Sequence, residues 1–257
     1  MIIAANLKMN FNRQQASAYL SSVSDHLPQV IGGHEAIIFV PHCYLQMASE
    51  AGFSSSQLSF GAQDCHHQPS GAFTGDVSAE MIADFSAEWV ITGHSERRAA
   101  HHEADPDVAA KANRALSAGL NVMVCVGEGL EDRQASNHLS FVASQIEAVF
   151  SVIRDAGLYQ GRRVAVAYEP VWAIGTGEVA RAQQISEMHQ HIRASLGQVS
   201  SDFGMLPLLY GGSVKPDNAA EILALDAVDG ALVGGASLDM SGFAEICAAA
   251  SNCSPGA

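Results

Sequence analysis

The sequence predicts a single-domain (β/α)8 barrel over residues 1–250, followed by a C-terminal tail at residues 251–257. Short apolar runs rich in β-branched residues recur along the chain, and most of them are followed by a helical pattern. Strands that alternate with helices pair in parallel, and nearly continuous apolar strands are buried on both faces. An open doubly wound sheet would also fit this pattern, but eight equivalent units without a Ser/Gly-rich linker favour a closed barrel.

Eight runs are expected to form the strands, and each crossover helix returns the chain to the same end of the sheet. Helical patterns between the strands include Val108–Ala118, Leu139–Ala156 and Ala182–Leu196. In chain order, the expected strands are Ile2–Met9, Ala36–Pro41, Leu58–Gln63, Trp89–Thr92, Asn121–Val126, Arg163–Glu169, Leu206–Tyr210 and Gly230–Val233.

The composition is typical of a globular protein and disfavours several classes of partner. Of the 257 residues, 48% are hydrophobic, yet no apolar run approaches the roughly 20 residues that span a bilayer. Asp and Glu outnumber Lys and Arg by 27 to 13, and the formal charge of −14 disfavours nucleic acid and anionic membranes. An anionic substrate is still possible, because a local site can be positive. Five cysteines without a CxxC pair, and an N-terminus without a leader pattern, predict reduced thiols and a cytoplasmic location.

Chemically active residues follow most of the expected strands. Ligands collect at the carboxyl ends of parallel strands, so these residues are the candidates for function. They are Asn6-Leu7-Lys8, Gly93-His94-Ser95-Glu96, Cys125-Val126-Gly127-Glu128, Glu169-Pro170, Tyr210-Gly211-Gly212-Ser213 and Gly234-Gly235-Ala236-Ser237.

Two glycine pairs indicate a phosphate site. Gly211-Gly212-Ser213 and Gly234-Gly235 each leave a strand and enter a helix. Glycine lets backbone N–H groups approach a ligand closely, and a helix start adds partial positive charge. One pair alone could be a tight turn, but two pairs on consecutive strands favour a phosphate cradle.

A carboxylate, an imidazole and an ammonium group accompany this cradle. Each has an ordinary alternative: Glu169 could be a solvated strand end, His94 a histidine satisfied by the backbone, and Lys8 a lysine that extends to solvent. Glu96 is expected to balance a cation such as Lys8, Arg97 or Arg98. Together the groups predict proton abstraction next to a carbonyl, with the oxygen stabilised by imidazole and ammonium and no metal or cofactor required.

The segment after Glu169 is expected to be a lid that closes over the site. Pro170 would stiffen its hinge, apolar residues would exclude water, and Gly175 would turn its N–H towards the phosphate. The expected lid comprises Pro170, Val171, Trp172, Ala173, Ile174, Gly175, Thr176 and Gly177.

The chain resembles the triosephosphate isomerase family, whose fold is the TIM barrel. The motifs AANLKMN, GAFTGDVSAEM, WVITGHSERR, CVGE, AYEPVWAIGTG, LYGGSV and ALVGGASL occur in the family's order and cover residues 1 to about 250. The resemblance implies that dihydroxyacetone phosphate and D-glyceraldehyde 3-phosphate are interconverted through an enediolate, in glycolysis and gluconeogenesis. It implies that Glu169 shuttles the proton, His94 is a neutral electrophile and Lys8 is an electrostatic anchor.

Further roles are implied by the same resemblance. Asn6 would bind the oxygen end of the substrate, Ser95 and Glu96 would support the site, and Cys125 would pack near the base. The amides of Gly175, Ser213, Gly234 and Gly235 would hold the phosphate. Ile174 and Leu232 would cover the base, and Tyr210 and Ser213 would latch the closed lid.

The segment Gln63–Asp76 resembles the family's protruding loop, with Thr74 near its tip. In the family this loop inserts beside the partner's active site, so the resemblance implies a homodimer. Some residues depart from the family pattern, including Leu7 where Trp is common and Ala99–His102 where a more aromatic segment is usual. These departures affect local packing and the interface, not the proposed catalytic groups.

The same residues disfavour other functions. The pairs His66-His67 and His101-His102 could indicate a metal site. However, adjacent side chains on an extended chain point opposite ways, and no carboxylate or cysteine completes a recognisable ligand spacing. Gly175-Thr176-Gly177 could begin a dinucleotide-binding fingerprint. The third glycine of that fingerprint is absent here, and no expected strand immediately precedes the segment. A sugar-phosphate epimerase would need metal ligands at several strand ends. A catalytically silent scaffold would be expected to have lost the base, the cation or the lid.

Overall fold

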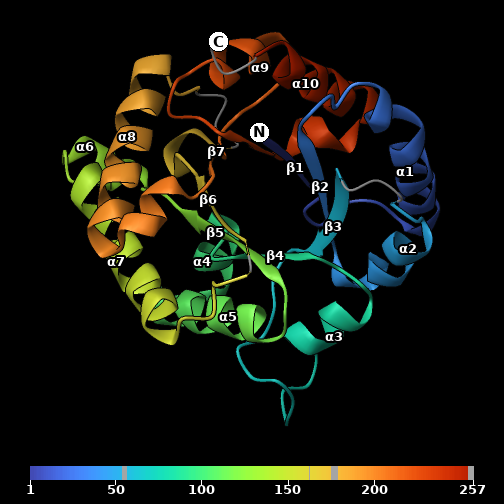
Figure 1. Ribbon diagram of the computed structural model, residues 1–257, viewed down its shortest axis with the longest axis horizontal. Coiled ribbons are helices and arrows are strands. Elements are labelled where there is room, and N and C mark those ends of the chain that lie inside the picture. The colour runs from blue at the N-terminus through green and yellow to red at the C-terminus, as the bar shows by residue number, and fades with distance from the viewer. Residues whose placement is uncertain (54–56, 162, 175–178, 254–257) are drawn as a thin grey trace.

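Strands and helices alternate along the chain, and eight parallel strands of the described residues close into a barrel in the order β1 to β8 (Figure 1). The computed structural model describes residues 1–53, 57–161, 163–174 and 179–253. β1 pairs with both β2 and β8, which closes the sheet and confirms the predicted (β/α)8 barrel. The strands are β1 (Ile2–Asn6), β2 (Glu35–Val40), β3 (Leu58–Ala62), β4 (Trp89–Thr92), β5 (Asn121–Val126), β6 (Val164–Tyr168), β7 (Leu208–Tyr210) and β8 (Gly230–Val233).

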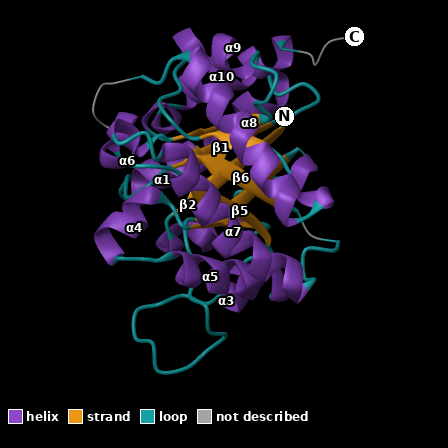
Figure 2. Cartoon of the chain, turned by 90° about the vertical axis from the view of Figure 1, so that its left-hand side faces the viewer, coloured by secondary structure: helices purple, strands orange, loops and turns teal. Residues whose placement is uncertain are grey.

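Helices surround the barrel, and the strands lie at the centre of the molecule (Figure 2). The helices are α1 (Arg13–His26), α2 (Leu45–Glu50), α3 (Ala79–Asp84), α4 (Ser95–His101), α5 (Asp105–Ser117), α6 (Leu130–Gln134), α7 (His138–Ala156), α8 (Ala182–Val199), α9 (Pro216–Leu223) and α10 (Met240–Asn252). None of these described helices is long and apolar enough to cross a membrane.

Several element ends differ from the sequence expectation by one to three residues, and those of β1 and α10 have an identifiable cause. β1 stops at Asn6 instead of Met9, because Lys8 takes a left-handed backbone conformation with φ 50° that cannot continue a strand. α10 includes Ser251 and Asn252, which the sequence placed in the tail. The hydroxyl of Ser251 donates a hydrogen bond to the carbonyl oxygen of Val30 (2.8 Å), so the last turn of the helix is attached to the body of the protein.

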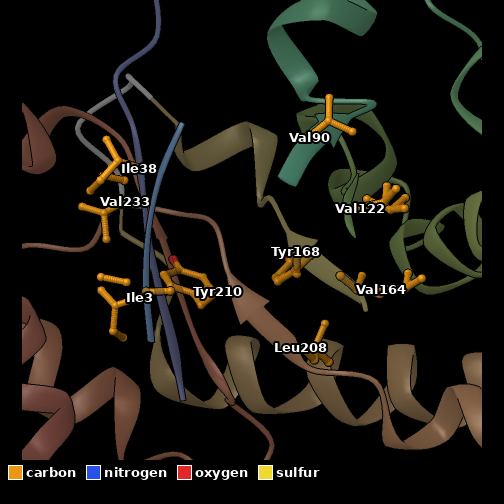
Figure 3. Close-up of a cluster of buried hydrophobic side chains, with 14 of the residues drawn as sticks. Ile3, Ile38, Val90, Val122, Val164, Tyr168, Leu208, Tyr210 and Val233 are labelled. Atoms are coloured by element: carbon orange, nitrogen blue, oxygen red, sulfur yellow. The ribbon is translucent and has the colours of Figure 1, made fainter. Parts of the chain in front are cut away.

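The apolar core has two layers, because successive strand residues point to opposite faces of the sheet. Ile2 and Ala4 belong to the cluster inside the barrel. Ile3, Val122 and Val164 belong to the larger cluster between strands and helices (Figure 3). This arrangement leaves both ends of the barrel for polar groups, and it fixes the strand ends that carry the candidate site.

A long loop between β3 and α3 projects away from the barrel (Figures 1 and 2). Its tip, which includes Phe73 and Thr74, is exposed. The rings of His66 and His67 stack with centroids 4.3 Å apart, and His66 also lies 4.2 Å from the ring of Phe73. The expectation that these adjacent histidines point opposite ways is therefore wrong, because the chain bends directly after His66 instead of continuing as a strand.

Candidate active site

A cleft of about 920 Å³ lies at the carboxyl ends of the strands. Residues that follow β1, β4, β6, β7 and β8 line it, so the barrel brings together groups that are far apart in the sequence. The lining includes these residues predicted from the sequence: Asn6, Lys8, His94, Ser95, Glu96, Glu169, Val171, Ile174, Ser213, Leu232, Gly234 and Gly235.

Glu169 follows β6 and is only 2% exposed. Its Oε2 accepts a hydrogen bond from the backbone N–H of Ser95 (2.8 Å), and its Oε1 accepts one from the Ser95 hydroxyl (3.0 Å). The Nε2 atom of His94 lies 3.0 Å from the same Oε1. A carboxylate this deeply buried is tolerated because donors surround both of its oxygens.

His94 stands at the start of α4, and its contacts define which nitrogen carries the proton. Its Nδ1 accepts a hydrogen bond from the backbone N–H of Glu96 (3.3 Å), so Nδ1 is unprotonated. The proton then lies on Nε2, which points at Glu169. The imidazole is therefore neutral and offers one N–H donor to the cleft.

Lys8 is fixed at both its backbone and its ammonium group. Its backbone N–H donates to Oδ1 of Asn6 (3.0 Å), and its carbonyl accepts from Nε2 of Gln63 (3.1 Å). The Nζ atom lies 2.6 Å from Oε1 of Glu96. The ion pair confirms the expectation that Glu96 balances a nearby cation, and it identifies Lys8 among the three cations considered.

The glycines after β7 and β8 allow close approaches that a side chain would block. A Cβ at Gly212 would lie 2.2 Å from the hydroxyl oxygen of Tyr210, and one at Gly234 would lie 3.1 Å from Cε of Lys8. Gly235 begins a 3-10 helix, Gly235–Leu238, and lines the same cleft as Ser213. Backbone donors at a helix start are suited to an anion such as phosphate.

The sequence of the whole chain matches one family. A family model described as triosephosphate isomerase covers residues 1–250. The chain belongs to the triosephosphate isomerase family. Among its relatives, the triosephosphate isomerase of Xanthomonas campestris pv. campestris (strain 8004) is 43% identical over 98% of each chain. The triosephosphate isomerase of Chelativorans sp. (strain BNC1) is 44% identical over 96% of each chain. That of Ruegeria sp. (strain TM1040) is also 44% identical, over 96% of this chain and 97% of the relative.

In this member of the family, six described residues that were predicted for the site do not line the cleft: Thr74, Cys125, Pro170, Trp172, Ala173 and Tyr210. Cys125 lies fully buried inside the barrel, where burial and the nearby carboxylate of Glu169 raise the pKa of its thiol. Tyr210 is also fully buried, with its hydroxyl against Gly212. Both residues touch groups that line the cleft, so they contribute to the shape of the site from behind it.

The described part of the expected lid begins with a 3-10 helix, Val171–Ala173. The backbone N–H of Val171 donates to the carbonyl of Glu128 (3.1 Å), and the indole Nε1 of Trp172 donates to Oε1 of the same residue (2.8 Å). The guanidinium of Arg133 lies 5.4 Å from the centre of the Trp172 ring. The remaining lid residues named from the sequence, Gly175, Thr176 and Gly177, lie outside the described residues.

Sequence reasoning places Glu128 among the strand-end candidates but assigns it no role, and the structure shows its contacts. It is fully buried, also accepts a hydrogen bond from the Tyr168 hydroxyl (3.1 Å), and has its pKa raised by burial. Its position just after the expected strand Asn121–Val126 is the one signal that the sequence contains. Its partner Trp172 is 44 residues away along the chain, so only the closed barrel reveals the contact.

The protruding loop lies outside the cleft, and Thr74 is exposed near its tip. Within the described ranges, no three His, Cys, Asp or Glu side chains gather as a metal-binding group. The described residues thus bring the carboxylate, the imidazole, the ammonium group and the two glycine turns into one cleft, and they place the loop at the molecular edge.

Proposed function

We propose that the chain interconverts dihydroxyacetone phosphate and D-glyceraldehyde 3-phosphate by proton transfer through an enediolate, without a metal or cofactor. The observation that carries the proposal is the contact of 3.0 Å between Glu169 Oε1 and the Nε2 donor of neutral His94, in the cleft that Lys8 also lines. A base, a neutral donor and a cation around one position are the groups that enolisation of a carbonyl requires.

In the forward reaction Glu169 takes the proton from carbon 1 of dihydroxyacetone phosphate. The electron pair of that C–H bond forms the double bond between carbons 1 and 2, and the carbonyl oxygen becomes an oxyanion. The Nε2–H of His94 and the ammonium of Lys8 stabilise this oxygen. Glu169 then returns the proton to carbon 2, and the hydroxyl proton moves between the two oxygens through the imidazole.

The resting contacts of Glu169 suggest how its basicity is controlled. Its carboxylate accepts two hydrogen bonds from Ser95, which lower its electron density and hold it. To reach the substrate carbon, the carboxylate must leave Ser95. A carboxylate that exchanges hydrogen-bond donors for an apolar surrounding is a stronger base. Ile174 and Leu232, which both line the cleft, would supply that surrounding.

Phosphate binding and lid closure complete the proposal. The amides of Ser213, Gly234 and Gly235 would hold the dianion, together with Gly175 and with Asn6 and Lys8 at the oxygen end of the substrate. The segment Pro170–Gly177 would close over the substrate and exclude water, latched by Tyr210 and Ser213. Trp172 and Val171, attached to Glu128, would provide the fixed end of that movement.

We also propose that residues 1–250 act as one domain and assemble as a homodimer in the cytoplasm. The exposed loop around Thr74 supports an intersubunit contact, and the five free cysteines are compatible with a reducing compartment. Sedimentation of the purified chain would test the dimer, and a monomer at micromolar concentration would contradict it.

The test of function is isomerisation of dihydroxyacetone phosphate by the purified chain in the presence of EDTA, and an inactive chain would refute the proposal. Glu169→Asp keeps the charge but withdraws the carboxylate by one methylene, which should lower kcat about 100-fold because a misplacement near 1 Å has that effect. Inhibition by inorganic phosphate should be unchanged. Glu245→Asp, at an exposed position in α10, is the matched control and should retain the wild-type kcat.

A further inference from the structure

Helix α4 carries three residues of the site but has almost no apolar attachment to the protein. It has seven residues, Ser95–His101, and Ser95 is its only buried residue. A helix this short is not stable by itself, and helices in proteins are normally held by an apolar face. The position of His94, Ser95 and Glu96 must therefore depend on polar contacts.

Four charged side chains form a closed ring beside α4, here called the ion-pair ring: Asp64, Arg97, Glu103 and Lys111. Arg97 contacts Asp64 (Nη2–Oδ2, 2.9 Å) and Glu103 (Nε–Oε1, 2.6 Å). Lys111 contacts the same two acids, at 2.8 Å and 2.6 Å. Each acid contacts both bases. Because the ring contains two acids and two bases, its formal charge is zero.

The ring connects four separate parts of the chain. Asp64 follows β3 at the base of the protruding loop, Arg97 lies in the first turn of α4, Glu103 precedes α5, and Lys111 lies within α5. The backbone N–H of Arg97 donates to the carbonyl of His94 (2.8 Å), so Arg97 belongs to the same turn as the imidazole. The Asp64 carbonyl is itself held by Nε2 of His42 (2.7 Å).

Burial shows what such a ring can contribute. The side chains of Asp64, Glu103 and Lys111 are at most 10% exposed. Buried ion pairs add little net stability, because desolvation offsets most of the Coulomb attraction, whereas in some proteins buried charged groups specify a single geometry. The ring is thus better suited to fixing a position than to stabilising the fold.

We propose that the ion-pair ring positions the first turn of α4, and that Asp64 and Arg97 are positioning residues for the isomerisation. This inference rests on the proposed function, because the ring acts through His94 and Glu96. The ring touches neither β7 nor β8, whose turns are proposed to bind phosphate. Loss of the ring should therefore lower kcat and leave phosphate binding intact.

Asp64→Asn tests the proposal, because asparagine has the same shape and leaves the two bases facing Glu103 alone. We expect kcat to fall about tenfold, with KM and inhibition by inorganic phosphate within about twofold of wild type, since sub-ångström displacement of catalytic groups affects the chemical step. The double variant Asp64→Asn/Lys111→Gln restores neutrality and should recover part of the loss.

A matched control distinguishes positioning from general destabilisation. Asp229→Asn breaks another Arg–Asp ion pair, Arg193 Nη2–Asp229 Oδ2 (2.6 Å), which is more exposed than the ring and lies at the amino-terminal end of the barrel. Both variants should lower the melting temperature, but only Asp64→Asn should lower kcat. Equal kcat values in both variants and the wild type would overturn the inference.

A second variant decides the matter if Asp64→Asn does not fold. Arg97→Lys keeps the charge but replaces the rigid planar guanidinium, whose Nη2 and Nε contact Asp64 and Glu103, with an ammonium on a flexible chain. The first turn of α4 should then be held less firmly, so kcat should fall in a folded protein. A wild-type kcat in Arg97→Lys would overturn the proposal. An inactive wild-type chain would overturn the proposed function and this inference with it, whereas an active wild type with unchanged variants overturns the inference alone.

Discussion

Gly127 occupies a position where any side chain would displace Glu169, the proposed catalytic base. A Cβ there would lie 1.7 Å from the carbonyl oxygen of Glu169, 2.7 Å from its carbonyl carbon and 3.2 Å from its Cα. A carbon and an oxygen normally approach to about 3.3 Å, so Gly127→Ala requires a shift of about 1.6 Å. The clash is between the added Cβ and backbone atoms of Glu169, and no side-chain rotation can relieve it.

The shift should be visible in catalysis, because the displaced backbone carries the carboxylate. The backbone N–H of Glu169 donates to Val126 (2.8 Å), so the two segments cannot separate without breaking that bond. A misplacement of 1 Å can lower a rate 100-fold, which corresponds to about 2.7 kcal/mol of transition-state stabilisation. We therefore expect Gly127→Ala to lower kcat/KM for D-glyceraldehyde 3-phosphate by at least 100-fold.

The same substitution two residues later is the control. A Cβ at Gly129 meets nothing closer than Oδ2 of Asp132 at 4.0 Å, and its φ of −81° suits alanine. Gly129→Ala should have wild-type kcat/KM and an unchanged melting temperature by circular dichroism. A folded Gly127→Ala protein whose kcat/KM lies within threefold of that of Gly129→Ala would refute the reasoning.

Two further predictions concern charge and pH. Lys215 lines the cleft, is exposed and forms no ion pair with a described residue. Its positive charge should attract the dianionic substrate, so Lys215→Met should lower kcat/KM two- to threefold at low ionic strength. Asp217→Asn removes a negative charge from the same cleft and should raise kcat/KM. Both effects should disappear in 1 M salt, where the Debye length is about 3 Å. Steady-state rates measured across a salt series test this, and a change of kcat/KM in the opposite direction would contradict the prediction. His189 is fully buried with its pKa lowered to about 4 by burial, so the unfolded chain binds a proton below about pH 6.5 that the folded chain binds only near pH 4. The free energy of unfolding in urea should fall by about 2 kcal/mol from pH 7 to pH 5, and His189→Gln should flatten that dependence; an equally steep variant would show that other groups cause it.

The candidate site shows how far local sequence patterns reach. Every expected strand is present, and the strand ends identified Glu169, His94 and Lys8 as neighbours before any contact was known. This works because parallel strands in a barrel must place their carboxyl ends on one face, so strand periodicity alone predicts which residues meet there. The prediction failed where the chain leaves regular structure, as at Lys8 and at the stacked His66 and His67.

The sequence by itself determined the barrel, the face that carries the chemistry and the residue types on it, because apolar periodicity and strand-end motifs are local properties of the chain. Only the tertiary structure decided which groups touch. It selected Lys8 as the partner of Glu96, joined Glu128 to Trp172, and closed the ring through Asp64 and Lys111, which lie 47 residues apart. Such contacts form between segments that are far apart in the sequence and that meet only when the barrel closes. A local sequence pattern therefore does not predict which side chains touch.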